Sequence, residues 1–212
     1  ASVAAWLRVG ELAFRQQTAK SFDKQQFKKD LEAEIRELAA NQPDDFAIRL
    51  QQLAASSGVV VIFTPSFSKA PLCGATRWIG DNPLIQLTDR YKTNDQFWFT
   101  FYHEAGHVLK HGKKEIFIEP EKGHAEENGK EEEANAFASE LLLPRSANKH
   151  LTAIASAKII CQLAETYHIH PGIVAGRYQH LTKKFNQFNN LKVKIQLPES
   201  LMATAKMKQD TE

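Results

Sequence analysis

The residues best suited to chemistry form one short segment, His103-Glu104-Ala105-Gly106-His107, and another histidine follows at position 111. The segment has the pattern HExxH. On an α-helix, residues four apart lie one turn above each other, so His103 and His107 can direct two imidazole nitrogens at one ion. Neutral imidazole is a good ligand for zinc. The spacing therefore predicts part of a metal site on a single helix.

Glu104 follows His103 directly and lies about 100° from it around a helix, so it need not bind the metal itself. Its carboxylate can instead reach a metal-bound water, whose pKa zinc lowers to about 7, and take its proton as the oxygen attacks a peptide carbonyl. The predicted chemistry is hydrolysis with Glu104 as general base. A purely structural role for both histidines, in the core or facing solvent, is the alternative.

Two histidines leave a catalytic zinc one protein ligand short. The next predicted helix offers Glu131, Glu132 and Glu133 near its start. Its buried side is marked by Ala134, Phe137, Ala138 and Leu141. Glu131 and Asn135 lie one turn apart along the helix, on a line beside that apolar side, so Glu131 can face a cleft. Glu132 and Glu133 are expected to be solvated charges near the helix start. Helix periodicity favours Glu131 as third ligand without excluding its neighbours.

These segments resemble a known family. The HExxH segment with His111, and the stretch EEEANAFASELLLP at residues 131–144, are similar to the ImmA/IrrE family of zinc metallopeptidases. The resemblance covers roughly residues 58–144. It implies a thermolysin-like, gluzincin-type site whose third ligand is the glutamate three residues before the alanine of the Ala-Asn pair, here Glu131. Zn²⁺ is the implied cofactor, with Mn²⁺ as an alternative.

Three further stretches look similar to the C-terminal portion of HigA-like addiction-module regulators: residues 74–78, 85–87 and 96–100. Such regulators often carry an N-terminal helix-turn-helix, and none is evident here, which argues against direct transcriptional repression by this chain. The wider family is associated with cleavage of DNA-binding repressors. The resemblance therefore implies a protein substrate of regulatory type, such as a transcriptional repressor or a toxin–antitoxin component.

The composition is that of a globular protein, with 42% hydrophobic and 25% charged residues in 212. The 27 basic and 25 acidic side chains give a net charge of +2, too balanced to indicate a nucleic acid or an anionic membrane as main partner. No apolar run approaches the roughly 18 residues that span a bilayer, and residues 1–10 hold no signal-peptide pattern. Cys73 and Cys161 lie in no paired spacing, so we expect a cytoplasmic protein.

The elements expected to position the site begin with three amphipathic helices, at residues 2–17, about 27–38 and 43–58. A buried strand at 59–63 and a hairpin of 76–79 and 84–87 then predict a small sheet of about three strands. Thr93 and Gln96 have the spacing of a capping box, so the HExxH helix is expected to run from Thr93 to Gly112. The helix of Glu131 is expected at about residues 127–143, after a polar loop at 123–130.

The C-terminal part is expected to contain two short helices, at residues 159–167 and 171–183, a strand at 191–197 and a polar tail. A helix-turn-helix that reads DNA is conceivable for this pair, but plain packing is favoured, and nucleic-acid contact is not expected of this chain alone. The predicted fold class is α+β, with helices packed on a small mixed or antiparallel sheet. We divide the chain into a helical segment (1–57), a metallopeptidase core (58–145), packing elements (146–197) and the tail (198–212).

Several secondary assignments stay open on sequence alone. His124, Tyr167 and Tyr178 are candidates for stabilising an oxyanion, and His111 can either contact the cleft or simply favour the helix end. An extended peptide can add along a sheet edge near Ile79 or Ile85. The competing function is a regulatory or antitoxin-like binding module that keeps a metal for folding or sensing without proteolysis.

Overall fold

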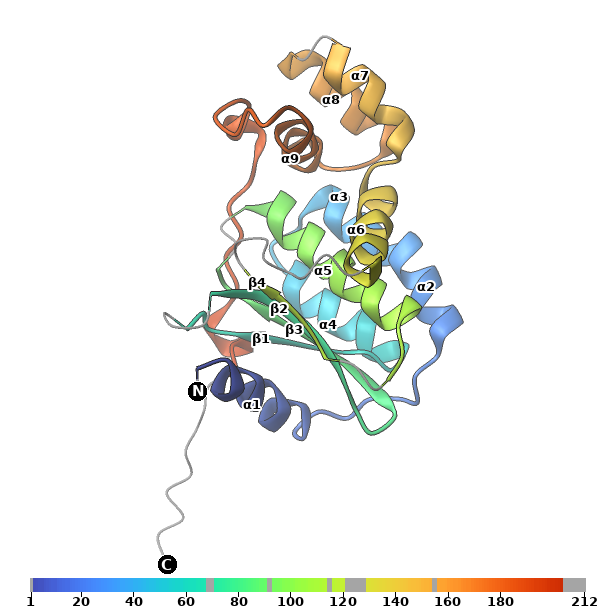
Figure 1. Ribbon diagram of the computed structural model, residues 1–212, viewed down its shortest axis with the longest axis vertical. Helices are drawn as coiled ribbons and strands as arrows, with labels where there is room; N and C mark the ends of the chain where they lie inside the picture. The colour runs from blue at the N-terminus through green and yellow to red at the C-terminus, as the bar shows by residue number, and fades with distance from the viewer. Residues whose placement is uncertain are drawn as a thin grey trace, which may run out of the picture.

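The computed structural model describes residues 2–67, 71–90, 93–113, 116–120, 129–153 and 156–203. Helices pack on a small four-stranded mixed sheet (Figure 1). The predicted α+β fold class is therefore confirmed. Across the described ranges, no helix combines the length and the apolar character needed to cross a membrane.

The helices are α1 (Ser2–Phe14), α2 (Lys24–Glu32), α3 (Glu34–Asn41), α4 (Phe46–Ser56), α5 (Asn94–Lys110), α6 (Gly129–Leu142), α7 (Asn148–Ala153), α8 (Ala157–Tyr167) and α9 (Pro171–Thr182). Short 3₁₀ turns lie at Arg145–Ala147, Asn189–Leu191 and Glu199–Leu201. The single helix expected at 27–38 is in fact two, because the backbone of Ala33 leaves helical geometry with φ −116° and ψ −92°. No proline or glycine marks this break in the sequence.

The strands are β1 (Val60–Thr64), β2 (Leu72–Ile79), β3 (Asn82–Thr88) and β4 (Phe117–Pro120), in the order β1-β3-β2-β4. The predicted hairpin is present as β2 and β3, and its turn contains Gly80 at φ +62°. Strand β1 pairs with β3 in parallel, and β4 pairs with β2 in antiparallel. Strand β4 was not expected from the sequence, so the sheet has one strand more than predicted.

The expected strand at 191–197 is absent; the segment holds a 3₁₀ turn and one bridge between Thr93 and Lys194. The start of the predicted tail lies along β1, where Met202 bridges to Phe63 and the Ala203 N–H donates to the Phe63 carbonyl at 2.8 Å. Residues 204–212 lie outside the described part of the chain. Met202 and Ala203 thus occupy the edge of the sheet at Phe63 of β1.

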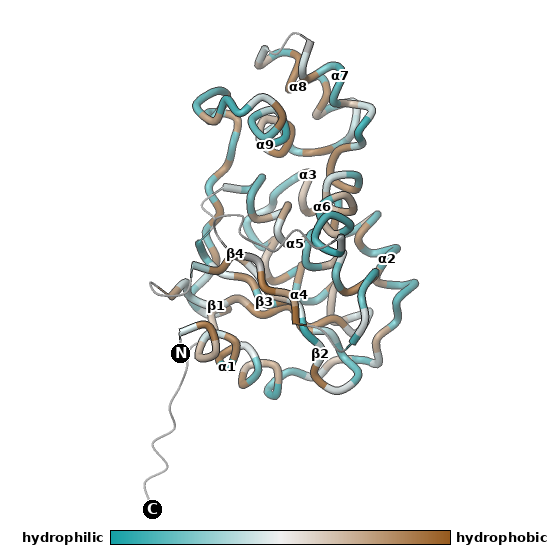
Figure 2. Tube along the Cα trace, in the orientation of Figure 1, coloured by the Kyte–Doolittle hydropathy of each residue, from teal (hydrophilic) through white to brown (hydrophobic). Residues whose placement is uncertain are grey.

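The sheet lies between two helical layers, with α1 on one face and α4 and α5 on the other (Figure 1). Its strands are largely hydrophobic along their length (Figure 2). Helix α1 approaches the sheet closely, because a Cβ at Gly10 would lie 2.0 Å from Gln86 Oε1. The same glutamine donates to the Trp6 carbonyl at 2.8 Å. Helix α1 therefore closes the face of the sheet away from the HExxH motif.

Helix α5 runs through the main hydrophobic core, where Phe97, Trp98, Phe101 and Tyr102 are buried. Polar contacts fix it along its length. The Trp98 indole donates to Gln42 Oε1 at 2.6 Å, the Tyr102 hydroxyl donates to the Leu31 carbonyl at 2.9 Å, and the Asn94 side chain accepts from the Val193 N–H at 3.1 Å. A helix that is hydrophobic over most of its surface belongs in the interior of a protein. The motif is thus carried by the most central helix.

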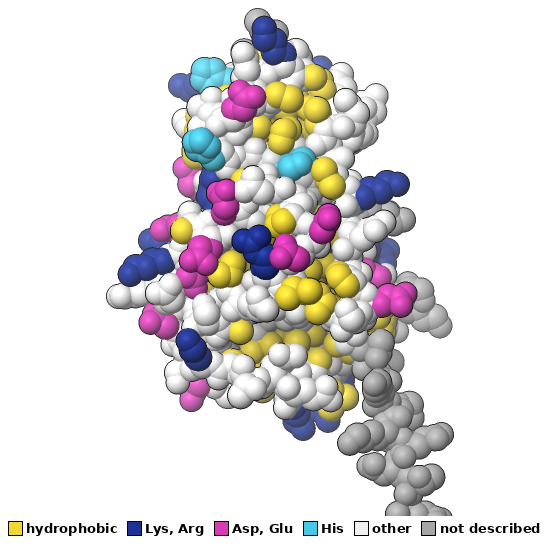
Figure 3. Space-filling model, turned by 180° about the vertical axis from the view of Figure 1, so that it is seen from behind, with side chains coloured by type: hydrophobic (Ala, Val, Ile, Leu, Met, Phe, Trp, Pro, Cys, Tyr) yellow, Lys and Arg dark blue, Asp and Glu magenta, His cyan; other side chains and the backbone are white. Residues whose placement is uncertain are grey.

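Helix α9 packs against α5, α7 and α8, and His180 is its single exposed residue. A DNA-recognition helix needs an exposed face of side chains that can enter a groove. This packing favours the structural interpretation of the α8–α9 pair. On the face seen in Figure 3, acidic and basic side chains are interspersed, and neither sign forms a continuous patch.

Candidate metal centre

The helices α5 and α6 lie side by side (Figure 1), and Gly106 permits their close approach. A Cβ at Gly106 would lie 3.1 Å from Phe137 Cδ1 and 3.2 Å from Ala134 Cα. The glycine inside HExxH is therefore needed for space, although glycine weakens a helix interior by about 1 kcal/mol relative to alanine. This contact brings the first turns of α6 beside the motif.

The structure brings His103, His107 and Glu131 together. The Nε2 atoms of the two histidines are 3.0 Å apart, and the Glu131 carboxylate lies 3.1 Å from His103 Nε2 and 3.4 Å from His107 Nε2. One ligand atom from each residue lies within 4.8 Å of the other two. Both histidines are buried, and the Glu131 side chain is 18% exposed. Within the described residues these three form a group able to hold one ion.

The electrostatics of this cluster favour the forms in which such side chains bind metals. Burial raises the pKa of the Glu131 carboxyl, but its interactions with the side chains of His103 and His107 outweigh this effect, and the pKa falls to about 2. Burial is also the largest influence on His107 and lowers the pKa of its imidazole. An ionised carboxylate beside a neutral imidazole is the state that metal binding requires.

Each histidine has a partner on its second ring nitrogen. Asn135 Oδ1 lies 3.0 Å from His103 Nδ1, and His111 Nδ1 lies 2.9 Å from His107 Nδ1. An amide oxygen can only accept, so it stabilises the tautomer of His103 with the proton on Nδ1 and a lone pair on Nε2. His111 can accept from His107 in the same way. Asn135 and His111 thus orient the two rings toward Glu131.

Glu104 lies on the inner side of α5 and is fully buried. Its Oε2 atom accepts a hydrogen bond of 2.6 Å from the Thr76 hydroxyl on β2. Gly74, two residues earlier on the same strand, also borders this carboxylate, because a Cβ there would lie 2.6 Å from Glu104 Oε1. Neither residue was identified from the sequence. A glycine inside a strand often marks close approach of another group, and that signal was available at Gly74.

Strand β4 borders the cluster through Phe117, whose ring stacks on His107 with centroids 3.9 Å apart and planes at 19°. Strands β2 and β3 are the two inner strands of the sheet. The expectation of a free edge near Ile85 is therefore wrong, because β3 pairs with strands on both sides, whereas β2 near Ile79 extends past the residues 72–76 that pair with β4. In the described chain the edge beside the histidines is β4, whose four residues were too few to be recognised as a strand.

Two of the candidates for oxyanion stabilisation, Tyr167 and Tyr178, have hydroxyl groups whose hydrogen-bond partners lie outside the cluster. Tyr178 is buried and donates to Gln187 Oε1 at 2.6 Å, and the Tyr167 hydroxyl lies 3.4 Å from Ser146 Oγ. His124 lies outside the described residues.

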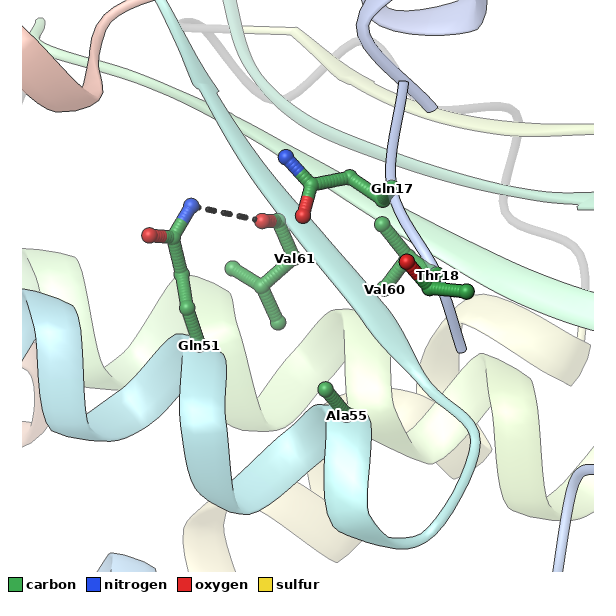
Figure 4. A pocket seen from close by; sticks show the side chains of 6 residues that line it. All are labelled: Gln17, Thr18, Gln51, Ala55, Val60 and Val61. Atoms are coloured by element: carbon green, nitrogen blue, oxygen red, sulfur yellow. Dashed lines mark hydrogen bonds between the residues drawn. The ribbon is translucent and has the colours of Figure 1, made fainter. Parts of the chain in front are cut away.

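A small cavity lined by Gln17, Thr18, Gln51, Ala55, Val60 and Val61 lies at the β1 edge (Figure 4). Its volume of about 30 Å³ suits one water rather than a peptide.

A comparison with protein families gives one match of direct relevance. The peptidase family described as the IrrE N-terminal-like domain matches residues 54–177, more than half of the 212-residue chain. The matched range contains the whole sheet, α5 and α6, and hence each residue of the cluster. No curated protein matches the chain.

Proposed function

Because the chain belongs to the peptidase family described as the IrrE N-terminal-like domain, we propose that it is a zinc-dependent endopeptidase that cleaves a protein substrate. The observation that carries the proposal is the convergence of His103, His107 and Glu131, whose ligand atoms lie within 4.8 Å of one another. Family membership supports a metallopeptidase-like role. The assignment of each residue's role is our own.

The donor set fits zinc. Two imidazole nitrogens and one carboxylate oxygen are the ligands of several catalytic zinc sites, which keep a fourth position open for water or substrate. A zinc ion held there supplies Lewis acidity, which activates water and polarises a peptide carbonyl. Manganese accepts the same donor types, so metal analysis of the purified protein distinguishes the two ions. We regard the site as gluzincin-type, because its third ligand is a glutamate from a later helix.

Glu104 is proposed as the general base. Its carboxylate takes a proton from the attacking water and returns it to the leaving amine nitrogen as the carbon–nitrogen bond breaks. Glu104 adjoins His103 in sequence and is buried on the same helix, which supports this role. Asn135 and His111 hold the two imidazole rings while the proton moves.

An extended substrate segment is proposed to pair with β4. The first residue of this strand, Phe117, stacks on His107, and no described strand pairs with the outer edge of β4. The opposite edge, β1, is occupied by Met202 and by Gln51, which donates to the Val61 carbonyl at 2.9 Å. Backbone pairing on an edge strand gives affinity with little dependence on substrate side chains.

The substrate is proposed to be a regulatory protein, such as a DNA-binding repressor or a toxin–antitoxin component, in line with the resemblance to ImmA/IrrE and HigA-like proteins. The cytoplasm is the proposed location, because Cys73 and Cys161 form no disulfide with each other. We also propose residues 58–145 as the catalytic core, on which residues 1–57 and 146–197 pack.

Replacement of Glu104 with glutamine tests the proposal. Cells that produce the wild-type chain and cells that produce Glu104→Gln are compared by proteomic identification of new protein N-termini, and zinc is measured in both purified proteins. The expected result is retained zinc in the variant and loss of a specific set of cleavage products. Identical N-termini in both strains, with the same cellular response, would instead support a non-proteolytic, antitoxin-like binding module.

A further inference from the structure

The carboxylate of Glu104 is held by a residue from a different layer of the fold. Glu104 and Thr76 are both buried, with 0% and 1% of their surfaces exposed. The Thr76 hydroxyl is 2.6 Å from Glu104 Oε2 and 3.1 Å from the Glu104 carbonyl oxygen. A hydroxyl has one proton, and the shorter, charge-assisted contact is the stronger of the two. The hydroxyl therefore donates to the carboxylate.

Thr76 is a rigid donor. It lies on β2, opposite Ile85 of β3 and opposite Phe117 of β4, so backbone pairing fixes the strand on both sides. Its β-branched side chain has few accessible χ1 rotamers. The hydroxyl oxygen is thus fixed relative to the sheet. It is also fixed relative to β4, because Thr76 pairs with Phe117, whose ring stacks on His107.

Gly74 provides the space that the carboxylate occupies. A Cβ at this position would lie 2.6 Å from Glu104 Oε1, 2.9 Å from Thr100 Cγ2 and 3.0 Å from Glu104 Cγ. The backbone of Gly74 is not in the left-handed region, so glycine is not required there for conformation. It is required because any side chain would displace the glutamate.

We propose that Thr76 and Gly74 are positioning residues for Glu104: the hydroxyl fixes the carboxylate in one rotamer, and the missing Cβ leaves room for that rotamer. This inference rests on the proposed function, in which Glu104 is the general base. A base that is oriented before the substrate arrives needs no reorganisation during the reaction. This role requires contact with Glu104 and no contact with the substrate or the metal ligands.

Three substitutions distinguish the effect of the Thr76 hydroxyl from the effect of the space at Gly74, and a control distinguishes both from a general loss of stability. Thr76→Val keeps the shape and removes the hydroxyl, Thr76→Ser keeps the hydroxyl, and Gly74→Ala fills the space beside the carboxylate. Thr64→Val is the matched control. Thr64 is a buried strand threonine on β1, and its hydroxyl bonds to the Leu87 carbonyl and the Gln86 amide.

The variants are loaded with zinc and tested on a synthetic peptide that spans a cleavage site found in the N-terminal comparison. Thr76→Val and Gly74→Ala are expected to lower kcat about tenfold to hundredfold, a part of the roughly 100- to 10,000-fold that a general base contributes. KM and zinc content stay unchanged. Thr76→Ser recovers most of the kcat, and Thr64→Val retains all of it. A wild-type kcat for Thr76→Val, or equal losses of kcat in Thr76→Val and Thr64→Val, overturns the inference.

Crystal structures of the same zinc-loaded proteins give a second readout that does not depend on turnover. The Glu104 side chain is expected to adopt another rotamer in Thr76→Val and Gly74→Ala, and the wild-type rotamer in Thr76→Ser. An unmoved carboxylate in Thr76→Val contradicts the positioning role. If wild type and Glu104→Gln yield the same N-termini, the peptidase proposal fails, and the rotamers still decide whether Thr76 and Gly74 fix Glu104.

Discussion

Of the 17 residues of α5, 13 are buried, whereas α6 buries three of its 14: Ala134, Ala138 and Leu142. Both helices contribute to one site. Helix α5 provides His103, Glu104 and His107 from within the core, and its orientation is fixed by contacts with several other elements. Helix α6 provides Glu131, and its position depends largely on its packing against α5. The comparison indicates that the residues on α5 are held rigidly by the core and that the more exposed helix α6 completes the site.

The largest effect is expected from the ligands themselves. His103→Ala, His107→Ala and Glu131→Ala are each expected to weaken zinc binding by more than about 100-fold, the upper end of the range for groups that only support ligands. Zinc affinity measured by competition with a chelator checks this. Glu132→Ala is the matched control, because Glu132 is exposed on the same turn of α6. Equal affinities for Glu131→Ala and Glu132→Ala would contradict the role of Glu131.

Gly106→Ala tests whether contact with α5 sets the position of α6. The added methyl would meet Ala134 Cα at 3.2 Å, so overpacking should cost about 1–3 kcal/mol, partly offset by about 1 kcal/mol of helix propensity. Zinc affinity should fall with it, because Glu131 moves away from the histidines.

Gly129→Ala is the control for this substitution, since nothing lies within 4 Å of the added Cβ. It should stabilise α6 by up to about 1 kcal/mol and leave zinc affinity unchanged. Chemical unfolding gives both free energies. If Gly106→Ala stabilises the protein as Gly129→Ala does, then the close packing of the two helices does not position Glu131.

Smaller losses are expected from the residues that orient the histidines. Asn135→Ala on α6 and His111→Ala at the end of α5 should each lower zinc affinity about 10- to 100-fold. Isothermal titration with zinc measures the effect, and unchanged thermal midpoints of the metal-free proteins exclude general unfolding. A loss confined to one variant would show that only one of the two helices needs a supporting hydrogen bond.

The smallest effect concerns the anchoring of α5 and its dependence on pH. Burial lowers the pKa of His170, which lies 2.9 Å from the Asn94 amide nitrogen and accepts from the Gly172 N–H. The imidazole therefore stays neutral in the folded protein while the unfolded chain binds a proton below a pH of about 6.5. Stability should be fully present above that pH and should decline as pH falls through the lowered pKa.

His170→Asn keeps a side chain that can cap α9 but removes the imidazole. Thermal midpoints of both proteins, measured between pH 8 and pH 5, therefore report the effect of protonating His170. The variant should lose less stability on acidification than the wild type does. Parallel curves for the two proteins would assign the pH dependence to the other histidines with a lowered pKa, His107 and His180.

The parts of the fold that were predicted from sequence have strong local signals. The HExxH helix has a regular apolar pattern and defined ends, and the β2–β3 hairpin has turn residues at Gly80. Strand β4 is only four residues long and gave no signal. The alternating pattern at 191–197 predicted a strand that is absent, because alternation alone supplies no partner strand.

The same distinction between local and long-range signals applies to the residues of the site. The ligands could be predicted because two lie on one helix at fixed spacing and the third is favoured by periodicity and by family resemblance. Thr76 and Gly74 could not, because their contact with Glu104 joins a strand to a helix 28 or more residues away in sequence. Asn135 shares a helical line with Glu131, yet its contact with His103 depends on how α5 and α6 pack together.

Residues 199–203 along β1 also bear on the solubility of the protein at high concentration. Exposed strand edges allow sheets of different molecules to join, and a continuous fibre needs two such edges on every molecule. With β1 occupied by Met202 and Ala203, edge-to-edge joining in the described part of the chain is limited to β4. If molecules join through this sheet, the described residues favour a pair that meets at β4 over a growing filament.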